Sequence, residues 1–80
     1  MNGNHTIIFE QPDGKIVRFR APNFAALCIA RFLAGQSGLY GNVAVMGPHG
    51  VAEVNPDGSL EVSWSNGSID RYDNRTSVCL

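Results

Sequence analysis

Three carboxylates, Glu53, Glu61 and Asp70, lie close together in the C-terminal third of the sequence. Carboxylates at such spacing could act as a general acid and base, or could bind a divalent cation. A catalytic pair of Glu61 and Asp70 would need a cleft, and a calcium or magnesium site would need oxygen ligands that surround the ion. The flanking residues instead alternate between apolar and polar, which predicts strands of an open sheet. We therefore expect these carboxylates to form a charged surface.

The remaining reactive side chains match no catalytic or metal-binding pattern. His5 and His49 fall in a predicted strand end and a turn, while Cys28 and Cys79 form no C-x-x-C pair, and no G-x-S-x-G or H-E-x-x-H motif occurs. The glycine-rich stretch 35–42 follows a predicted helix, whereas a phosphate-binding loop leads from a strand into a helix. We predict a protein that is not an enzyme, with no cofactor or metal, exposed histidines and reduced thiols.

Composition and charge narrow the class of protein further. The 80 residues are 44% hydrophobic with a net charge of −1, which predicts a single globular domain over residues 1–80. Residues 1–50 hold four basic and two acidic groups, and residues 51–80 hold two basic and five acidic ones. Because a nucleic-acid-binding protein carries a Lys and Arg excess, direct nucleic-acid binding is not expected. The sequence shows no basic leader and no apolar run near the ~20 residues of a membrane span, so we expect a cytosolic protein.

The pattern of turns and apolar residues predicts an α+β fold with one antiparallel sheet packed on a single helix, in the order ββαββββ. Residues 5–20 form a hairpin around a three-residue turn, Pro12-Asp13-Gly14, which fixes the strand register. That register pairs Phe9 with Val17, Ile7 with Phe19, Glu10 with Ile16 and Ile8 with Arg18, and it directs Ile7, Phe9, Val17 and Phe19 to the core.

The stretch after this hairpin has helical character from Phe24 to Ala34, with Asn23 as the expected N-cap and Gly35 as the residue after the last turn. A helical wheel predicts that a stripe of Ala25, Cys28, Ile29, Phe32 and Leu33 faces the sheet. The opposite face consists of Leu27, Ala30, Arg31 and Ala34. It is unusually apolar for a surface, so either loops or the C-terminal tail cover it, or Leu27, Ala30 and Ala34 mediate contact with a partner or a second copy in a homodimer.

Two further turns set the registers of the remaining strands, 43–46, 51–54, 60–65 and 68–73. Pro56-Asp57-Gly58 repeats the first turn and pairs Glu53 with Glu61, while Asn66-Gly67 is typical of a two-residue turn. A two-residue turn would pair Trp64 with Ile69, Ser63 with Asp70 and Glu61 with Tyr72. Under these registers the helix side carries Val43, Val45, Ala52, Val54, Leu60, Val62, Trp64 and Ile69.

The opposite side of the sheet then gathers the three carboxylates. Glu53 directly opposite Glu61 destabilises a sheet by up to about 1 kcal/mol, so the pair suggests a use. Either the acidic residues solubilise an exposed face, with Arg71 or Arg18 compensating, or they form a recognition patch for a basic partner. The candidate partner-binding residues are Glu53, Glu61, Asp70, Tyr72, Met46 and Val51.

The stretches RAPNFAALCIARFLAGQSGLYGNVAVMG (20–47) and VNPDGSLEVSW (54–64) complete this picture of a small antiparallel sheet, one alanine-rich helix and an acidic face. In type, the chain resembles the small phage-encoded anti-CRISPR proteins. The resemblance implies a non-enzymatic inhibitor in the host cell cytoplasm that binds a type I CRISPR effector complex, a ribonucleoprotein with a basic groove. Such an inhibitor blocks either nucleic-acid binding or recruitment of the nuclease. The alternative is a small phage structural or assembly protein that self-associates through the apolar face of its helix.

Overall fold

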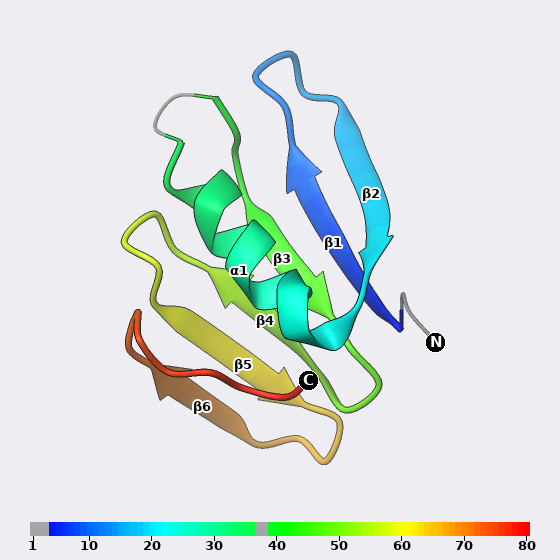
Figure 1. The fold of residues 1–80 in the computed structure, drawn as a ribbon, viewed down its shortest axis with the longest axis vertical. Coiled ribbons are helices and arrows are strands. Elements are labelled where there is room, and N and C mark those ends of the chain that lie inside the picture. The colour runs from blue at the N-terminus through cyan, green and yellow to red at the C-terminus, as the bar shows by residue number, and fades with distance from the viewer. Residues whose placement is uncertain (1–3, 37–38) are drawn as a thin grey trace.

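The computed structural model describes residues 4–36 and 39–80. In these residues, one helix packs on a six-stranded antiparallel sheet with the strand order β2-β1-β3-β4-β5-β6 (Figure 1). This confirms the predicted α+β fold and the order ββαββββ. The elements are β1 (His5–Glu10), β2 (Ile16–Ala21), α1 (Asn23–Ala34), β3 (Val43–Met46), β4 (Gly50–Val54), β5 (Leu60–Trp64) and β6 (Ile69–Tyr72).

The first hairpin, β1 and β2, has the predicted register. Phe9 pairs with Val17 and Ile7 with Phe19, and all four side chains contribute to or pack against the core under the helix. Strand β3 lies on the other side of β1, where Val45 pairs with Ile7. The chain therefore crosses from β2 to β3 through α1, and the predicted glycine-rich connection lies in this crossover. Residues 37 and 38 of that connection are outside the described residues.

The turns that join β1 to β2 and β4 to β5 have the same backbone hydrogen bonds. In the first turn, Gln11 N–H donates to Lys15 O and Gly14 N–H donates to Gln11 O. In the second turn, Asn55 N–H donates to Ser59 O and Gly58 N–H donates to Asn55 O. Gly14 and Gly58 have φ of +88° and +89°, the left-handed conformation that closes a three-residue turn with a bulge. Both Pro-Asp-Gly turns were predicted correctly, and Glu53 pairs with Glu61 as expected.

The turn between β5 and β6 differs from the prediction. Trp64 N–H donates to Ser68 O and Gly67 N–H to Trp64 O, and Gly67 has φ of +94°. The turn therefore has three residues, with Ser65 at the position of the prolines in the other two turns. Because one more residue lies in the turn, β6 shifts by one position relative to β5, and a one-residue shift moves every side chain to the other face. The observed pairs are Leu60 with Tyr72, Glu61 with Arg71, Val62 with Asp70 and Ser63 with Ile69.

The helix packs on the sheet through the face opposite to the predicted one. Ala26, Leu27, Ala30 and Ala34 are buried, whereas Phe24, Cys28 and Phe32 are exposed. Small side chains let the helix backbone approach the valines and alanine of β3 and β4, and phenylalanines at this interface would hold the two layers apart. The prediction that the stripe of Ala25, Cys28, Ile29, Phe32 and Leu33 faces the sheet was therefore wrong. Of its large residues, Ile29 and Leu33 are half-buried and pack against the edge of the core.

The ends of the helix also differ from the prediction. Pro22, in an extended conformation, is the N-cap, and no side chain caps the first turn. Asn23 is instead the first helical residue, because the Pro22 carbonyl accepts the first bonds of the helix, from the N–H groups of Ala25 and Ala26 at 3.0 Å. Gly35 ends the helix with φ of −79°, so it does not adopt the left-handed conformation. Its N–H donates to Arg31 O at 3.0 Å and continues the helical bonding.

Residues 73–80, here called the tail, cover the part of the sheet that the helix leaves free. The tail runs beside α1 on the same side of the sheet, in front of β5 and β6 (Figure 1). Leu80 is almost completely buried and Val78 packs against the core. The Leu80 carbonyl accepts a hydrogen bond from His49 N–H, and a Cβ on Gly47 would collide with the Leu80 backbone. A glycine at position 47 thus makes room for the end of the tail.

Candidate binding surface

The side of the sheet that faces away from α1 is the candidate surface, here called the outer sheet face. The helix and the tail both lie on the opposite side of the sheet, so neither of them covers this face (Figure 1). The pairings of the five strand interfaces place its members in rows that run across the sheet. The central row contains Arg18, Ile8, Ala44, Glu53, Glu61 and Arg71, and the row beside it contains Arg20, Thr6, Met46, Val51, Ser63 and Ile69.

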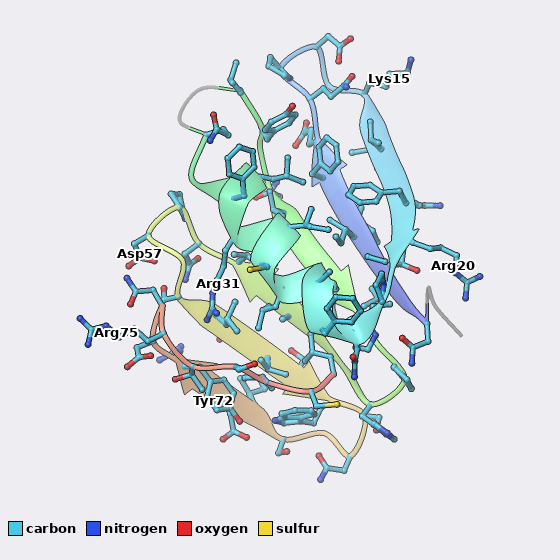
Figure 2. The ribbon with its side chains drawn as sticks, in the orientation of Figure 1. Lys15, Arg20, Arg31, Asp57, Tyr72 and Arg75 are labelled. Atoms are coloured by element: carbon cyan, nitrogen blue, oxygen red, sulfur yellow. The ribbon has the colours of Figure 1, made fainter. Side chains whose placement is uncertain are left out.

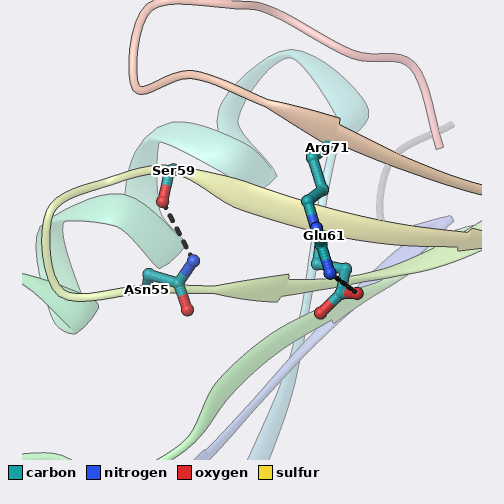
Figure 3. Close-up of polar contacts among 4 residues, drawn as sticks. All are labelled: Asn55, Ser59, Glu61 and Arg71. Carbon is teal, nitrogen blue, oxygen red and sulfur yellow. Dashed lines mark hydrogen bonds and ion pairs between the residues drawn. The ribbon is translucent and has the colours of Figure 1, made fainter.

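The charges of this face are separated along the sheet. Arg18 and Arg20 lie on the edge strand β2, and Glu53 and Glu61 lie opposite each other on β4 and β5. On β6, the Arg71 guanidinium lies 3.4 Å from the Glu61 carboxylate (Figure 3). Both side chains of this ion pair are well exposed, so the pair adds little stability. Compensation by Arg71, one of the two arginines suggested from the sequence, is therefore observed at Glu61.

Apolar side chains accompany the carboxylates. Met46 and Val51 face each other on β3 and β4 and are 43% and 37% exposed. Ile69, 61% exposed, joins the same row on β6 because of the shifted register. The predicted position of Met46 and Val51 on the outer face is thus correct, and Ile69 is an outer-face residue that the sequence analysis placed under the helix. Its position next to Ser63 follows from the three-residue turn.

Asp70 and Tyr72 do not belong to this surface. Asp70 pairs with the buried Val62, and its carboxylate accepts a hydrogen bond of 2.8 Å from the indole N–H of Trp64. Tyr72 pairs with Leu60 and packs half-buried against the core (Figure 2). The predicted patch of three carboxylates is therefore reduced to the pair Glu53 and Glu61. The cause is again the length of the β5–β6 turn.

The residues predicted for self-association are not accessible. Leu27, Ala30 and Ala34 are part of the hydrophobic core beneath α1. A contact through them would require the helix to leave the sheet, so this prediction is wrong. The exposed apolar residues of the helix are instead Phe24, Cys28 and Phe32, and two of these, Cys28 and Phe32, were predicted to face the sheet.

Two hollows of the surface include titratable side chains. One cavity of about 270 Å³ is lined by Ala34, Tyr40 and Asn55 with their neighbours. A shallower one contains His49 and Asp70, but Asp70 is engaged by Trp64, and no hydrogen bond of the described residues joins it to His49. Within residues 4–36 and 39–80, no group of three or more His, Cys, Asp or Glu side chains is arranged to hold a metal ion.

The two histidines differ in environment. His49 is exposed, as predicted. His5 is 3% exposed, and its Nδ1 lies 2.8 Å from the Asn4 side-chain oxygen. The expectation of an exposed His5 is therefore wrong, because β1 is flanked on both sides by other strands and its first residue faces the core side. Cys28 and Cys79 are both free and exposed thiols.

Among the residues that the structure describes, the carboxylates of Asp57 and Asp73 have lowered pKa values, and both lie in turns. The hydroxyl and the backbone N–H of Ser59 donate to Asp57 and lower its pKa. In the tail, the pKa of Asp73 is lowered by the backbone N–H of Arg75, the Thr76 hydroxyl and further donors. Such bonds stabilise the charged form of a carboxylate in a local turn. These shifts therefore report turn structure and do not mark a reactive site.

Comparison with known proteins gives no relative: no protein-family model, no curated protein and no solved structure matches this chain. The part of the chain that the structure describes contains no helix of the length and apolar character needed to cross a bilayer.

Proposed function

We propose that this protein is a non-enzymatic binding protein that docks its outer sheet face on a basic surface of a bacterial nucleoprotein complex. The most concrete partner is a type I CRISPR effector complex, whose binding to nucleic acid the docked protein would block. The observation that carries the proposal is the placement of Glu53 directly opposite Glu61 on a sheet face that neither the helix nor the tail covers.

The cost of this pair supports a binding role. Like charges in directly opposed positions destabilise a sheet by up to about 1 kcal/mol. Arg71 contacts Glu61 through one exposed ion pair, and it lies on the far side of Glu61 from Glu53. A basic partner would relieve the remaining repulsion, so the complex gains both the new attraction and the lost repulsion.

The neighbouring row supplies the apolar part of such an interface. Met46, Val51 and Ile69 are exposed beside the carboxylates, and protein interfaces combine an apolar centre with charged residues at the rim. The arginines on β2 define an orientation, since a basic surface would avoid that edge. The partner should therefore contact β4 and β5 most closely.

The proposal is tested with a purified type I effector complex and its target DNA in an electrophoretic mobility assay. We expect the protein to reduce DNA binding by the complex and to lose that effect when Glu53 is changed to Lys. Because charged contacts at a rim act mainly on the association rate, the variant should show a lower association rate constant that depends less on salt. Kinetics on an immobilised effector complex at two ionic strengths measure this.

Asp70→Lys is the matched control, because it reverses an exposed carboxylate on the other side of the sheet. It should leave the inhibition unchanged while Glu53→Lys abolishes it. Equal effects of the two reversals would show that only overall charge matters and would overturn the docking surface. An unmodified protein that binds the effector complex without reducing its DNA binding would overturn the proposed block. One that does not bind the immobilised complex would exclude the type I effector complex as the partner.

A further inference from the structure

The outward side of α1 carries two largely exposed phenylalanines. Phe24 is 84% exposed and Phe32 is 67% exposed, and the Cys28 thiol lies between them. These three residues, here called the helix stripe, follow one another at four-residue intervals on one side of the helix. Large exposed apolar patches on otherwise polar surfaces mark interaction sites. The helix stripe is on the opposite side of the molecule from the outer sheet face.

The arrangement of the helix stripe favours a second copy of the chain as its partner. In a two-fold symmetric interface the same patch of both copies is in contact. If residue i of one copy touches residue j of the other, residue j of the first copy also touches residue i of the second. The stripe reads the same in both directions from Cys28, with a phenylalanine four residues before it and another four residues after it. It also carries no charge, so it does not select a partner of complementary charge. We propose that a second copy of this chain covers the helix stripe, with Cys28 on the two-fold axis.

Helix-packing geometry fits this dimer. Residues at four-residue intervals form the ridges of the commonest helix-packing class, in which two helices cross at about −50° and 8–10 Å apart. The small Cys28 lies at the crossing point, where the helices are closest. An antiparallel arrangement places Phe24 of one copy beside Phe32 of the other, and it also brings opposite ends of the helix dipoles together.

The area available is that of a weak dimer. A phenylalanine buries roughly 150–250 Å² when it is completely covered, so four rings that are largely exposed at present supply on the order of 600 Å². The surrounding helix surface brings the total toward the roughly 1,000 Å² at the lower end of specific interfaces. We therefore expect reversible association with a Kd on the order of micromolar.

Sedimentation equilibrium over a concentration series tests the association. The apparent mass should rise from 8.6 kDa toward twice this value. Phe24→Glu should weaken the Kd by more than about tenfold, because it buries a charge in an apolar contact. The fold should be retained, since the position is exposed and an acidic residue is favourable in the first helical turn. Ile69→Glu, the same kind of change on the outer sheet face, should leave the Kd unchanged.

Oxidative cross-linking tests the position of the axis. With copper phenanthroline and oxygen as the oxidant, two Cys28 thiols lose two electrons and two protons and form one disulfide. A Cys79→Ser chain, in which Cys28 is the sole thiol, should cross-link at least about tenfold faster than a Cys28→Ser chain, whose sole thiol, Cys79, is also exposed. Addition of the Phe24→Glu change should remove the difference.

Two results would overturn the dimer. The first is a monomeric mass at all concentrations, and the second is cross-linking of Cys28 that is no faster than that of Cys79. If the helix stripe captured another protein while the chain itself stayed monomeric at all concentrations, the dimer would also be overturned. The outcome does not depend on the proposed function, because Glu53 and Glu61 lie on the opposite side of the molecule and their substitution leaves the helix stripe intact.

Discussion

Two different structures cover the same side of the sheet, and they are held in place by different forces. The helix α1 packs on β1, β2, β3 and β4, and its buried residues are alanines and Leu27. The tail covers β5 and β6 as irregular chain, with Leu80 as its buried residue. Between the two lies Arg31, whose guanidinium donates to the carbonyl oxygens of Gly58, Asp73 and Thr76 (Figure 2).

The difference shows how a short chain can cover a wide sheet with a single helix. A helix satisfies its own backbone groups, so it can pack through apolar side chains alone. Irregular chain has backbone carbonyls that need partners, and a charged arginine supplies several donors in a fixed geometry. The stability of the part of the molecule under α1, here called the helix half, should therefore respond to changes in side-chain volume. The stability of the part under the tail, here called the tail half, should respond to changes in hydrogen bonding and pH.

The largest effect is expected for Ala30→Leu, which adds volume where the helix is closest to the sheet. Ala30 is completely buried, and overpacking of a core costs about 1–3 kcal/mol. We expect a loss near the upper end of this range in urea unfolding, because the rigid sheet cannot move away. Cys28→Ala on the exposed side of the same helix should change stability by less than about 0.5 kcal/mol. Comparable losses for both variants would mean that the helix is not oriented as described.

A smaller and more local effect is expected for Arg31→Met, which retains an apolar stem but removes the donors. Hydrogen bonds from charged groups contribute about 1.5–3 kcal/mol each when buried, and solvent reaches part of this site, so we expect a total loss of about 1–2 kcal/mol. Hydrogen exchange should become faster at Thr76 and His49 than in α1 or β3. Uniform acceleration throughout the protein would contradict a separate tail half.

The smallest effect is expected in the pH dependence of stability, through Asp73. The pKa of Asp73 is lowered in the folded protein, chiefly by the backbone N–H of Arg75, so the folded state favours its charged form. This stabilisation is complete above the unfolded value of ~3.9 and is lost as pH falls below it through the lowered folded-state pKa. In Asp73→Asn the residue no longer titrates. The stability difference between the two proteins should therefore be constant near neutral pH and change only below about pH 4, as measured by thermal unfolding. A difference that is the same at every pH would exclude this role.

The sequence was sufficient for most of the sheet. Asp13 and Asp57 each precede a glycine and follow a proline, and this combination predicted two turns and two registers correctly. The third turn was misassigned because Asn66-Gly67 alone is typical of a two-residue loop. The side chain of Asn66 has the same role in its turn as the two aspartates have in theirs. In all three turns, a side-chain Oδ1 accepts the backbone N–H of the residue two positions later. Comparison of the three turns within the chain would have revealed this.

The helix orientation could not be obtained from apolar periodicity. Apart from Asn23 and Arg31, every residue of α1 is apolar, so both faces resemble a core face. The choice depends on size and not on polarity, because the close approach to β3 and β4 admits alanines and excludes phenylalanines. Arg31 gave a misleading signal, since its half-buried side chain serves the tail and does not mark the solvent side. The acidic pair was predictable, whereas Asp70 and Tyr72 were lost with the register of β6.

The order of the strands also has a consequence for how the chain folds. Neighbouring strands β1 and β2, and each successive pair from β3 to β6, are joined by short connections, so these pairings can form soon after the chain collapses. The pairing of β1 with β3 is different, because it brings Phe9 beside Val43 across the whole crossover. Closing so long a loop is entropically expensive before its contacts form. We therefore expect the pairing of β1 with β3 to limit the folding rate. The β1–β2 hairpin and the strands β3 to β6 would each be ordered before they meet at this pairing.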